Sequence, residues 1–518
     1  MSHYVLGIDA GTESFRAAVF DERGRCAGFG TSPNRTLFPR PGHAEQNPRD
    51  WDNALAESIR MAVSASGVDP RSIEGIGVDG TTCTVVLLDQ AGNPLRTALE
   101  WMDIRATAEA AEIAATGDAA LSYVGFGNVS PEWFPCKALW LKRNEPALYD
   151  TAATIFEQTD WLAWRLSGER TVNINTISVR WFYNAREGGY PMSLYRAIGL
   201  ESVFDRVPSR IVKIGEVVGG LTSAMAGLTG LREGIPIAGG GGDAFIGVLG
   251  VDVLRPGKLA LITGSSQLQI GFTEKSIHAP GLFGSYPDAI IDGAEIIEAG
   301  QVSTGSVLRW FTNGFVGDAV RAEADRKGLS LFDYLNAQAS AVQPGSDGLV
   351  VLEHWQGNRT PWTDPSSRGV IRGLSLSHGP AHLFRAIMEG IAYGSQVIIE
   401  LMESSGVVIE QVVACGGATM SNLWMQINAD VTGKPITIPE EQQAVALGSA
   451  IAATVAAGIH STIAQAASEM VRTKRVFEPD PALTDRYREY VAQYVSTYEH
   501  LKDDSRRLTR SLGKLGPS

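Results

Sequence analysis

The stretch VLGIDAGTESFRAAVF at residues 5–20 has a counterpart in the second half of the chain, KLALITGSSQLQIGF at residues 258–272. Each stretch predicts two apolar strands joined by a tight turn. The turn is Gly-Thr in the first hairpin and Gly-Ser-Ser in the second, and the two turns fall at the same place. This faint internal repeat indicates two related domains that join near residue 255.

The composition agrees with two folded domains. The chain has 518 residues, more than one hydrophobic core usually holds, and 44% of them are hydrophobic while 19% are charged. The net charge of −13 argues against a nucleic-acid surface. The four cysteines form no CxxC pair, which favours a reducing compartment without structural zinc. No charged leader and no run of about 18 apolar residues is found, so we expect a cytoplasmic protein without a membrane span.

The pattern of apolar residues predicts strands and helices in both halves. A helix is expected at residues 47–67, a hairpin at 73–95, and a long amphipathic helix at 381–403. The last 40 residues indicate a charged amphipathic helix with a frayed tail. The expected organisation is a first domain at residues 1–254, a second at 255–490, and a C-terminal helix and tail at 491–518.

A GxGxxG pattern at Gly75, Gly77 and Gly80 is not interpreted as a dinucleotide site. Such a site must follow a strand and open a helix, whereas the next residues, TTCTVVLLD, are typical of a strand. The sequence also contains no GxxxxGK[ST] phosphate loop and no HExxH zinc motif.

The turn of the first hairpin carries residues suited to phosphate. Gly11 lets an anion approach backbone N–H groups, while Thr12 and Ser14 add hydroxyl donors and Arg16 adds a positive charge. Asp9 at the end of a strand is placed to hold a magnesium ion through water. The alternative is a surface hairpin with an ordinary polar tip.

Two more glycine turns lie in the second half. One of them can bind phosphate in the same way as the first hairpin turn, through backbone N–H groups and hydroxyls, and consists of Gly264, Ser265 and Ser266. Small residues between a buried strand and a helix would admit a flat ring or a ribose; they are Gly416, Gly417 and Ala418. A simple strand-to-helix turn is the alternative for this third site.

Taken in order, these turns resemble the FGGY family of carbohydrate kinases over residues 4–458. Further stretches support the resemblance, including WMDIRA at 101–106, EAGQVSTGSVLRW at 298–310, GNRTPWTDPSSRG at 357–369 and AVALGSAIAA at 444–453. The resemblance implies an α/β fold of two actin-like, ribonuclease-H-like domains with a cleft between them. Sugar is then held mainly by the first domain and ATP mainly by the second, where Gly305 joins the phosphate-binding residues. The implied cofactors are ATP and Mg²⁺, with Asp9 and Asp243 as the residues expected at the metal.

The resemblance also assigns a role to the glycine-rich stretch AGGGGDAF at residues 238–245. In similar kinases the aspartate after the glycines is the catalytic base, which here is Asp243, and it also lies near the metal. The glycines, including Gly242, are then expected to leave room for the γ-phosphate and the reacting end of the sugar. The alternative is that Asp243 caps the following helix.

The same resemblance gives a hypothesis for the sugar, because the family reads substrate largely with the hairpin VDGTTCTVVLLD. Xylulokinases have a Met-His pair, and glycerol kinases Arg-Glu, where Thr82 and Cys83 stand here. Ribulokinases have an Asp-x-Thr-x-Cys-Thr run, which matches the hairpin residues Asp79, Thr81, Cys83 and Thr84. We therefore expect ribulose or a related pentulose, with xylulose, ribitol, erythritol and glycerol as alternatives.

Four more residues are candidates for the sugar pocket, namely Trp101, Asp103, Glu132 and Lys137. An indole can stack on the apolar face of a sugar, and carboxylates can fix hydroxyl groups. Trp101 could instead be a core aromatic, and Arg105 is expected to form a structural salt bridge.

Two other classes of protein share this fold and stay open at this point. One is a sugar-binding regulator without activity, and the other is an ATPase of the actin or chaperone type, with no sugar pocket. The resemblance also leaves a homodimer open, since members of the family are often dimers.

Overall fold

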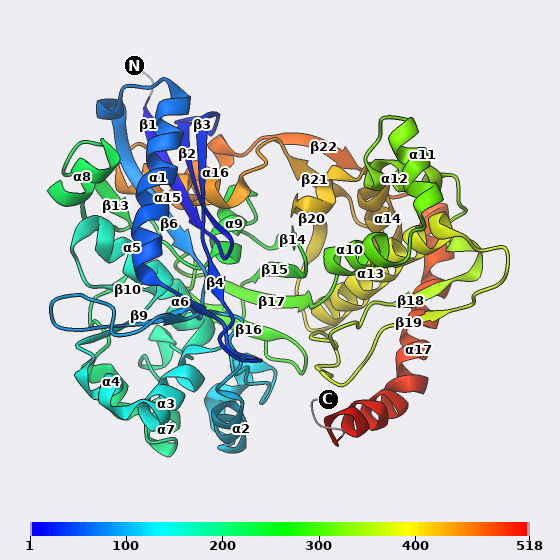
Figure 1. Cartoon of the computed structure of the whole chain (residues 1–518), viewed down its shortest axis with the longest axis horizontal. Coiled ribbons are helices and arrows are strands. Elements are labelled where there is room, and N and C mark those ends of the chain that lie inside the picture. Colours follow the sequence, from blue (N-terminus) through cyan, green and yellow to red (C-terminus); the bar gives the residue numbers. More distant parts are fainter. Residues whose placement is uncertain (1–2, 515–518) are drawn as a thin grey trace.

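Two β-sheets form the centres of two domains (Figure 1). The computed structural model describes residues 3–514. The first sheet has the order β12 (Val217–Gly220), β13 (Pro236–Ala238), β6 (Ile73–Gly80), β1 (Tyr4–Ala10), β2 (Ser14–Asp21) and β3 (Cys26–Pro33). The second has the order β16 (Phe283–Pro287), β17 (Glu295–Gln301), β15 (Gln267–Thr273), β14 (Gly257–Thr263), β20 (Ile409–Gly416), β21 (Ile436–Pro439) and β22 (Thr473–Phe477).

The strand orders confirm the internal repeat predicted from the two hairpins. The order β3-β2-β1-β6-β13 in the first sheet corresponds to β17-β15-β14-β20-β21 in the second. In each sheet the first strand forms an antiparallel hairpin with the second and pairs in parallel with β6 or β20 on its other side. The expected α/β fold of two actin-like, ribonuclease-H-like domains is therefore present.

Small sheets complete the two domains. One has the order β4 (Thr36–Leu37), β5 (Glu45–Gln46), β8 (Ala98–Leu99), β7 (Val85–Leu88) and β9 (Thr154–Glu157). The others pair β10 (Val172–Asn173) with β11 (Ile211–Val212) and β18 (Val350–Leu352) with β19 (Val370–Arg372).

Helices surround the sheets of each domain. In the first half they are α1 (Pro48–Ser66), α2 (Thr107–Ala115), α3 (Phe134–Asn144), α4 (Pro146–Thr151), α5 (Gln158–Ser167), α6 (Ile174–Arg180), α7 (Met192–Ala197), α8 (Ser223–Thr229) and α9 (Asp243–Gly250). In the second half they are α10 (Gly305–Gly314), α11 (Asp318–Arg326), α12 (Leu331–Ser340), α13 (Pro380–Ser404), α14 (Asn422–Thr432), α15 (Ala444–Ala456), α16 (Ile463–Met470) and α17 (Pro481–Lys514). Within residues 3–514, none of the helices has the length and apolar character needed to cross a lipid bilayer.

Local sequence signals explain where the first long helix begins and ends. The side chain of Asn47 accepts a hydrogen bond from the backbone N–H of Arg49, and Pro48 fits the first turn because it needs no N–H partner there. Gly67 ends α1 in the left-handed conformation, with φ of 65°. The helix expected at residues 47–67 is thus confirmed.

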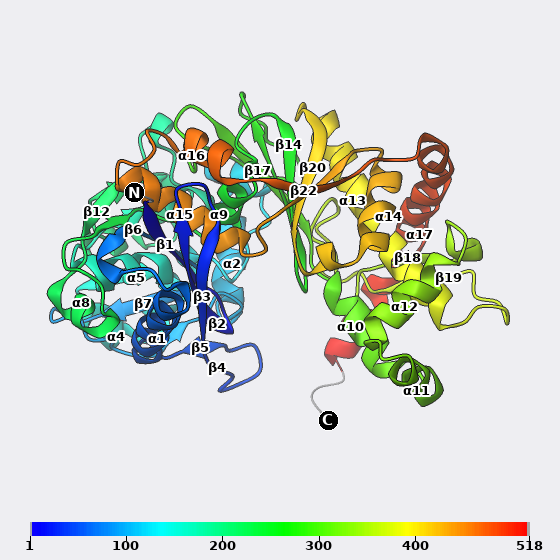
Figure 2. The same ribbon diagram turned by 90° about the horizontal axis from the view of Figure 1, so that it is seen from above.

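The helices α9 and α15 are exchanged between the domains. The helix α9 follows the first sheet in the chain but also contacts β14 and β15 of the second, whereas α15 follows the second sheet and packs on β1 and β6 of the first. Figure 2 shows α15 and α16, coloured orange, on the side of the first domain. The expected second domain at residues 255–490 is therefore interrupted by residues 444–470, because their apolar side chains belong to the first core.

Glycines allow this exchange because they bring backbones together. A Cβ atom on Gly77 would lie 1.8 Å from the carbonyl oxygen of Ser449, and one on Gly448 would lie 2.0 Å from that of Ile246. Gly75 and Gly77 therefore serve the contact between β6 and α15, and the strand β7, not a helix, follows β6. This agrees with the rejection of a dinucleotide site here.

The C-terminal helix belongs to the second domain. The helix α17 begins at Pro481, before the boundary expected at residue 491, and Tyr487, Tyr494 and Tyr498 are buried in the second core. These aromatic contacts give α17 a packed face along its first half. The expected tail at residues 515–518 lies outside the described residues.

We predict that Gly448→Ala lowers the free energy of unfolding by about 2 kcal/mol or more, because the new methyl group would force α15 away from α9. The measurement is urea unfolding followed by tryptophan fluorescence. Gly227→Ala is the control, since Gly227 lies in α8 with open space around it and alanine favours a helix by about 1 kcal/mol. Equal stability of Gly448→Ala and the unchanged protein would contradict the close packing.

Candidate active site

Three carboxylates meet at one edge of the first sheet. The strands β1 and β6 pair in parallel with Asp9 opposite Asp79, and Gly80 forms a parallel bridge with Gly242. The carboxyl ends of β1, β6 and β13 therefore lie side by side, and Asp243 begins α9 just beyond this edge. Sequence reasoning identified Asp9 and Asp243 as site residues but Asp79 only as part of the hairpin pattern, and the strand register is what places Asp79 beside Asp9.

Burial and mutual repulsion keep these carboxylates hard to ionise. Burial and the charge of nearby Asp9 together raise the pKa of Asp243 to about 6, while the N–H of Ala244 opposes the shift. The pKa of Asp79 lies well above its ordinary value because of burial and the charge of Asp9. Burial also raises the pKa of Asp9, although Arg16 opposes it. This edge of the sheet therefore holds three carboxyl groups with little positive charge beside them.

Asp243 is held at the start of α9 without being its cap. Gly242 occupies the N-cap position, and Oδ1 of Asp243 accepts a hydrogen bond of 2.7 Å from the N–H of Ala244. The alternative interpretation, in which Asp243 is the N-cap residue of α9, is therefore wrong, because Gly242 occupies that position. Its carboxylate is instead the first side chain of the helix.

The glycines before Asp243 are explained by contacts within the protein. A Cβ atom on Gly240 would lie 1.8 Å from the carbonyl oxygen of Val78, and one on Gly242 would lie 2.2 Å from Cγ2 of Thr82. On Gly241 it would lie 2.8 Å from Oδ1 of Asn175. The expectation that they leave room for phosphate and sugar is corrected at these positions, because the strand β6, the helix α6 and the hairpin fill the space where a side chain would lie.

The first hairpin turn links phosphate candidates to the sugar candidates. Arg16 donates to Oδ2 of Asp9 at 2.9 Å, so its charge partly balances that carboxylate. The indole Nε1 of Trp101 donates to Oγ1 of Thr12 at 2.8 Å, and Thr12 in turn lies 3.4 Å from Oε1 of Glu100. Trp101 is half-buried, so the structure leaves part of its ring free. Gly11 and Ser14 close the turn through a backbone hydrogen bond of 3.1 Å.

The glycine turns of the second domain come together at the matching edge of its sheet. The last residue of β14, Thr263, pairs with Gly416 of β20, and its hydroxyl accepts a hydrogen bond from the N–H of Ala418. The N–H of Gly305 donates to the carbonyl of Gly264 at 3.2 Å, which fixes α10 against the turn. The structure therefore gathers the predicted phosphate and nucleotide residues Gly264, Ser265, Ser266, Gly305, Gly416, Gly417 and Ala418.

The helix α9 brings the two edges near each other. Gly247 lies one helical turn after Asp243, and a Cβ atom on Gly247 would lie 3.7 Å from Cδ1 of Ile262. Ile262 stands two residues before Gly264 at the end of β14. The base candidate and the second glycine turn thus lie at opposite ends of one short contact between the domains.

Two of the predicted sugar ligands are fully engaged with the protein. Asp103 is buried and accepts hydrogen bonds from Arg105 and from the N–H of Ala44, which confirms the expected salt bridge of Arg105. Lys137 is buried, and its Nζ donates to the carbonyls of Cys83, Glu100 and Trp101. We therefore correct the expectation for Asp103 and Lys137, since their polar atoms already have partners.

An ion pair between the domains was missed from the sequence. The guanidinium of Arg180, at the end of α6, donates to both carboxylate oxygens of Glu298 on β17, at 3.0 Å each. Its positive charge also lowers the pKa of Cys83 and of Asp243 against their burial, so it lies close to both. Arg180 and Glu298 stand in the stretches VNINTISVRW and EAGQVSTG, and only their contact reveals them as part of the site.

Comparison with known proteins identifies the architecture. A family model described as "FGGY family of carbohydrate kinases, N-terminal domain" matches residues 4–250, and its C-terminal counterpart matches residues 259–457. The chain belongs to the FGGY family of carbohydrate kinases. It is therefore a phosphotransferase, and the family uses ATP as its phosphate donor.

Relatives of the FGGY chain extend over nearly its whole length. It is 32% identical to a ribulokinase of Geobacillus thermodenitrificans, covering 96% of this chain and 94% of the relative. An FGGY carbohydrate kinase domain-containing protein of Danio rerio is also 32% identical, over 97% of this chain and 98% of the relative. The crystal structure of a xylulose kinase from Rhodospirillum rubrum matches with a TM-score of 0.84 at 28% identity, over 97% of this chain and 100% of that one.

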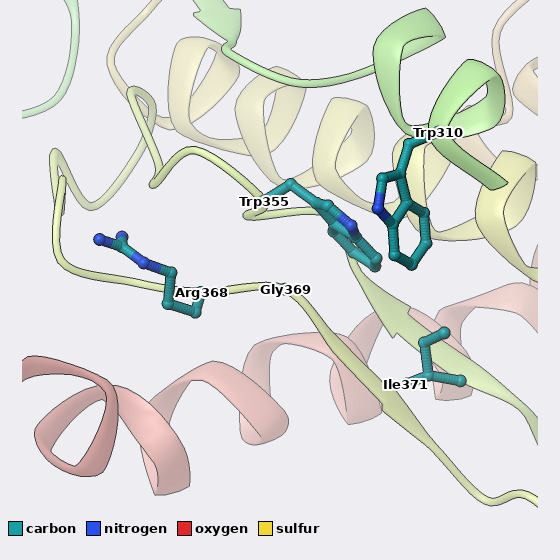
Figure 3. A pocket seen from close by; sticks show the side chains of 5 residues that line it. All are labelled: Trp310, Trp355, Arg368, Gly369 and Ile371. Carbon is teal, nitrogen blue, oxygen red and sulfur yellow. The ribbon is translucent and has the colours of Figure 1, made fainter. Parts of the chain in front are cut away.

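Pockets elsewhere on this FGGY kinase do not contain the predicted site residues. One cavity of about 370 Å³ in the second domain is lined by Trp310, Trp355, Arg368, Gly369 and Ile371. Figure 3 shows its two indole rings side by side, and their planes meet at 69° in an edge-to-face contact. Another, of about 500 Å³, is lined by Arg25, Cys26, Glu440, Glu441 and Arg472. We place the site by its chemistry, because neither cavity holds an acid positioned beside the glycine turns.

We predict that Arg180→Met lowers the free energy of unfolding by about 3–5 kcal/mol, because it leaves the buried carboxylate of Glu298 without its partner. Urea unfolding measures this loss. Arg143→Met is the matched control, since Arg143 forms a similar pair with Glu112 that is about 40% exposed and should contribute less than about 1 kcal/mol. A loss no larger than that of the control would contradict the burial of the interdomain pair.

Proposed function

We propose that the protein transfers the γ-phosphate of ATP to a terminal hydroxyl of a pentulose, with ribulose as the first candidate. The observation that carries the proposal is the contact of the substrate hairpin with the base candidate: Cγ2 of Thr82 lies directly over Gly242, the residue before Asp243. The hairpin also has the Asp-x-Thr-x-Cys-Thr run, and relatives at 32–34% identity are named ribulokinase.

Asp243 is proposed as the general base. Its carboxylate would accept the proton of the sugar hydroxyl while the oxygen forms a bond to the γ-phosphorus and the bond from phosphorus to the β,γ-bridging oxygen breaks, which releases ADP. A pKa of about 6, raised by burial, is close to the working range of such a base. In this proposal Arg180, Glu132 and the half-buried Trp101 bind the sugar, since the charges of Arg180 and Glu132 affect the pKa of Cys83 and the N–H of Trp101 donates to Oγ1 of Thr84. Glu298 would orient Arg180.

The glycine turns are proposed to bind the nucleotide. Gly11 to Arg16 and Gly264 to Ser266 would receive the phosphates through N–H and hydroxyl donors, and Gly416 to Ala418 would lie under the ribose or the base. Their location at matching sheet edges supports this division, because the two turns follow the corresponding strands β1 and β14 of the repeated hairpin.

Magnesium is part of the proposal, with Asp9 and Asp243 holding it through water. Oxygen ligands suit Mg²⁺. The buried Oδ1 of Asp79, beside Asp9, has no hydrogen-bond partner, so a cation could be accommodated next to it. Among residues 3–514 no group of three or more His, Cys, Asp or Glu side chains is arranged to hold a metal ion. When bound, Mg²⁺ would neutralise charge on the β- and γ-phosphates.

We also propose a reducing, cytoplasmic location. The four cysteines are free thiols, and Cys26 is exposed while Cys83, Cys136 and Cys415 are buried. Free thiols are usual where disulfides are kept reduced.

A panel of acceptors tests the substrate. ATP consumption by the purified protein would be measured with ribulose, xylulose, ribitol, erythritol and glycerol, each as separate stereoisomers where they exist. We expect the highest kcat/KM with a pentulose, because the hairpin carries the ribulokinase pattern. Preference for glycerol or erythritol would refute the pentulose, and ATP hydrolysis that no polyol stimulates would favour an ATPase of the actin or chaperone type.

We predict that Asp243→Asn lowers kcat by at least about 100-fold while sugar binding persists, because the amide cannot accept the proton. In the unchanged enzyme, kcat/KM should rise with pH through about 6, since the carboxyl group must lose its proton to act as a base and burial raises its pKa. Activity follows from ADP release, and binding from calorimetry with the sugar alone. Asp150→Asn, at a largely exposed carboxylate, is the control. Full activity of Asp243→Asn would end the assignment of the base.

A further inference from the structure

The tip of the substrate hairpin has a backbone conformation that side chains rarely adopt. Cys83 has φ of 66°, in the left-handed region that favours glycine and asparagine. Such a residue persists only where its surroundings hold it, and conformations of this kind are often found at functional sites. The groups that hold Cys83 therefore need to be identified.

Two buried side chains of opposite charge hold the backbone of Cys83. Its N–H donates to Oε2 of Glu157 at 2.7 Å, and its carbonyl accepts from Nζ of Lys137 at 2.8 Å. The exposed fraction of both Glu157 and Lys137 is 0%. Hydrogen bonds to charged groups are shorter and stronger than neutral ones, so together they can fix a strained residue.

The two holding residues are themselves fixed. Oε1 of Glu157 accepts from the indole Nε1 of Trp181 at 2.7 Å, and that indole stacks on Phe134 with ring centroids 3.5 Å apart. The carbonyls of Glu100 and Trp101 take the other hydrogen bonds of Lys137. Neither side chain can move without breaking several contacts.

The rest of the hairpin tip turns its polar groups inward. The hydroxyls of Thr81 and Thr84 lie 2.7 Å apart, and Oε1 of Gln158 accepts from both the N–H and the hydroxyl of Thr81. Cys83 is 4% exposed, so its thiol is also enclosed. Of the tip residues 81–84, Thr82 alone is only half-buried, and it contacts Gly242.

We propose that Glu157 and Lys137 are positioning residues that select the sugar by fixing the Thr82–Cys83 tip beside Asp243, with Cys83 acting through its backbone and not through its thiol. The inference rests on the proposed pentulose kinase activity for its kinetic part. The competing view is a buried charge pair that only stabilises the first domain.

The kinetic test is Glu157→Gln, which has nearly the same shape. A glutamine can accept from only one of the two N–H donors and turns its own NH₂ toward the other, so the tip loses a charged partner. We expect the KM for the pentulose to rise at least about tenfold, from the lost charge-assisted hydrogen bond, with the KM for ATP within about twofold of the unchanged enzyme. Lys137→Gln should likewise raise the KM for the pentulose and leave the KM for ATP within about twofold of the unchanged enzyme.

The matched control is Glu389→Gln. Glu389 is also 0% exposed, but it lies in α13 of the second domain, where it accepts from Arg385 and Tyr487. The Glu389→Gln variant should lower the free energy of unfolding without changing the KM for the sugar. Equal changes in both variants, or a rise in both KM values for Glu157→Gln, would show a merely structural role and overturn the proposal.

Alkylation of Cys83 gives a readout that needs no activity. Native protein would be treated with iodoacetamide, and the labelled peptides measured by mass spectrometry. In the unchanged protein Cys26 should react while Cys83 stays protected, because the former is exposed and the latter buried. In Glu157→Gln, Cys83 should react at least about tenfold faster, and in Glu389→Gln it should stay protected. Continued protection of Cys83 in Glu157→Gln overturns the proposal.

Cys83→Gly separates the backbone from the thiol. Glycine adopts the left-handed conformation without strain and keeps both hydrogen bonds of the tip, so the sugar KM should rise less in this variant than in Glu157→Gln. A loss of sugar binding as large as in Glu157→Gln would assign the role to the thiol and overturn the proposal. If the unchanged protein phosphorylates no pentulose, the proposed function fails, whereas alkylation without sugar still decides whether Glu157 holds the tip.

Discussion

The parallel pairing of β1 with β6, which sets Asp9 opposite Asp79, is the constraint on which the site depends. It places two carboxylates on neighbouring strands at one level, and the bridge from Gly80 to Gly242 adds Asp243 at the next strand. Burying such acids together is unfavourable, and among residues 3–514 only Arg16 and the hydroxyl of Ser449 donate side-chain hydrogen bonds to the first two. The fold therefore places unfavourable electrostatics at the edge that we propose as the active site, and clusters of this kind are often found at functional sites.

The exchange of α9 and α15 explains how the carboxylate edge of the first sheet is also held by contacts with the second domain. Because α9 starts at Asp243 and also contacts the second sheet, the base candidate moves with the contact between the domains. The chain crosses between the domains again near residues 440–443 and 471–472, where the N–H of Glu440 donates to the carbonyl of Arg472. A relative rotation of the domains would bend these short segments and leave the close glycine contacts of α9 and α15 intact.

Periodicity and turn chemistry predicted the fold to a useful degree. The hairpin repeat gave two related domains, and the long helix expected at residues 381–403 is α13, Pro380–Ser404. The exchange of α15 could not be predicted, because a buried apolar helix fits either domain and only three-dimensional packing decides between them. The same limit explains why the glycines at residues 239–242 were read as space for ligands: a missing side chain leaves room, but the sequence does not say what fills it.

The site was predicted less completely than the fold. Asp9, Asp243 and the glycine turns follow strands directly, so their neighbourhood was readable from the sequence. Arg180 and Glu298 are 118 residues apart and meet only when the domains assemble. Asp103 and Lys137 were found by residue type, but type alone cannot show that their hydrogen bonds are already taken by Arg105 and by backbone carbonyls.

The hairpin that we propose to select the sugar suggests how one fold could serve several sugars. The side chains of the pattern residues Asp79, Thr81, Cys83 and Thr84 are all buried, so the pattern describes how the hairpin is built more than what it touches. A different pair at positions 82 and 83, such as the Met-His or Arg-Glu of other kinases in this family, would change both the exposed side chain and the conformation at the tip. Specificity can then change without altering Asp243 or the nucleotide turns, because the hairpin is held by Glu157 and Lys137 from beneath. Selection of the sugar would in this way depend on buried charges that never contact it.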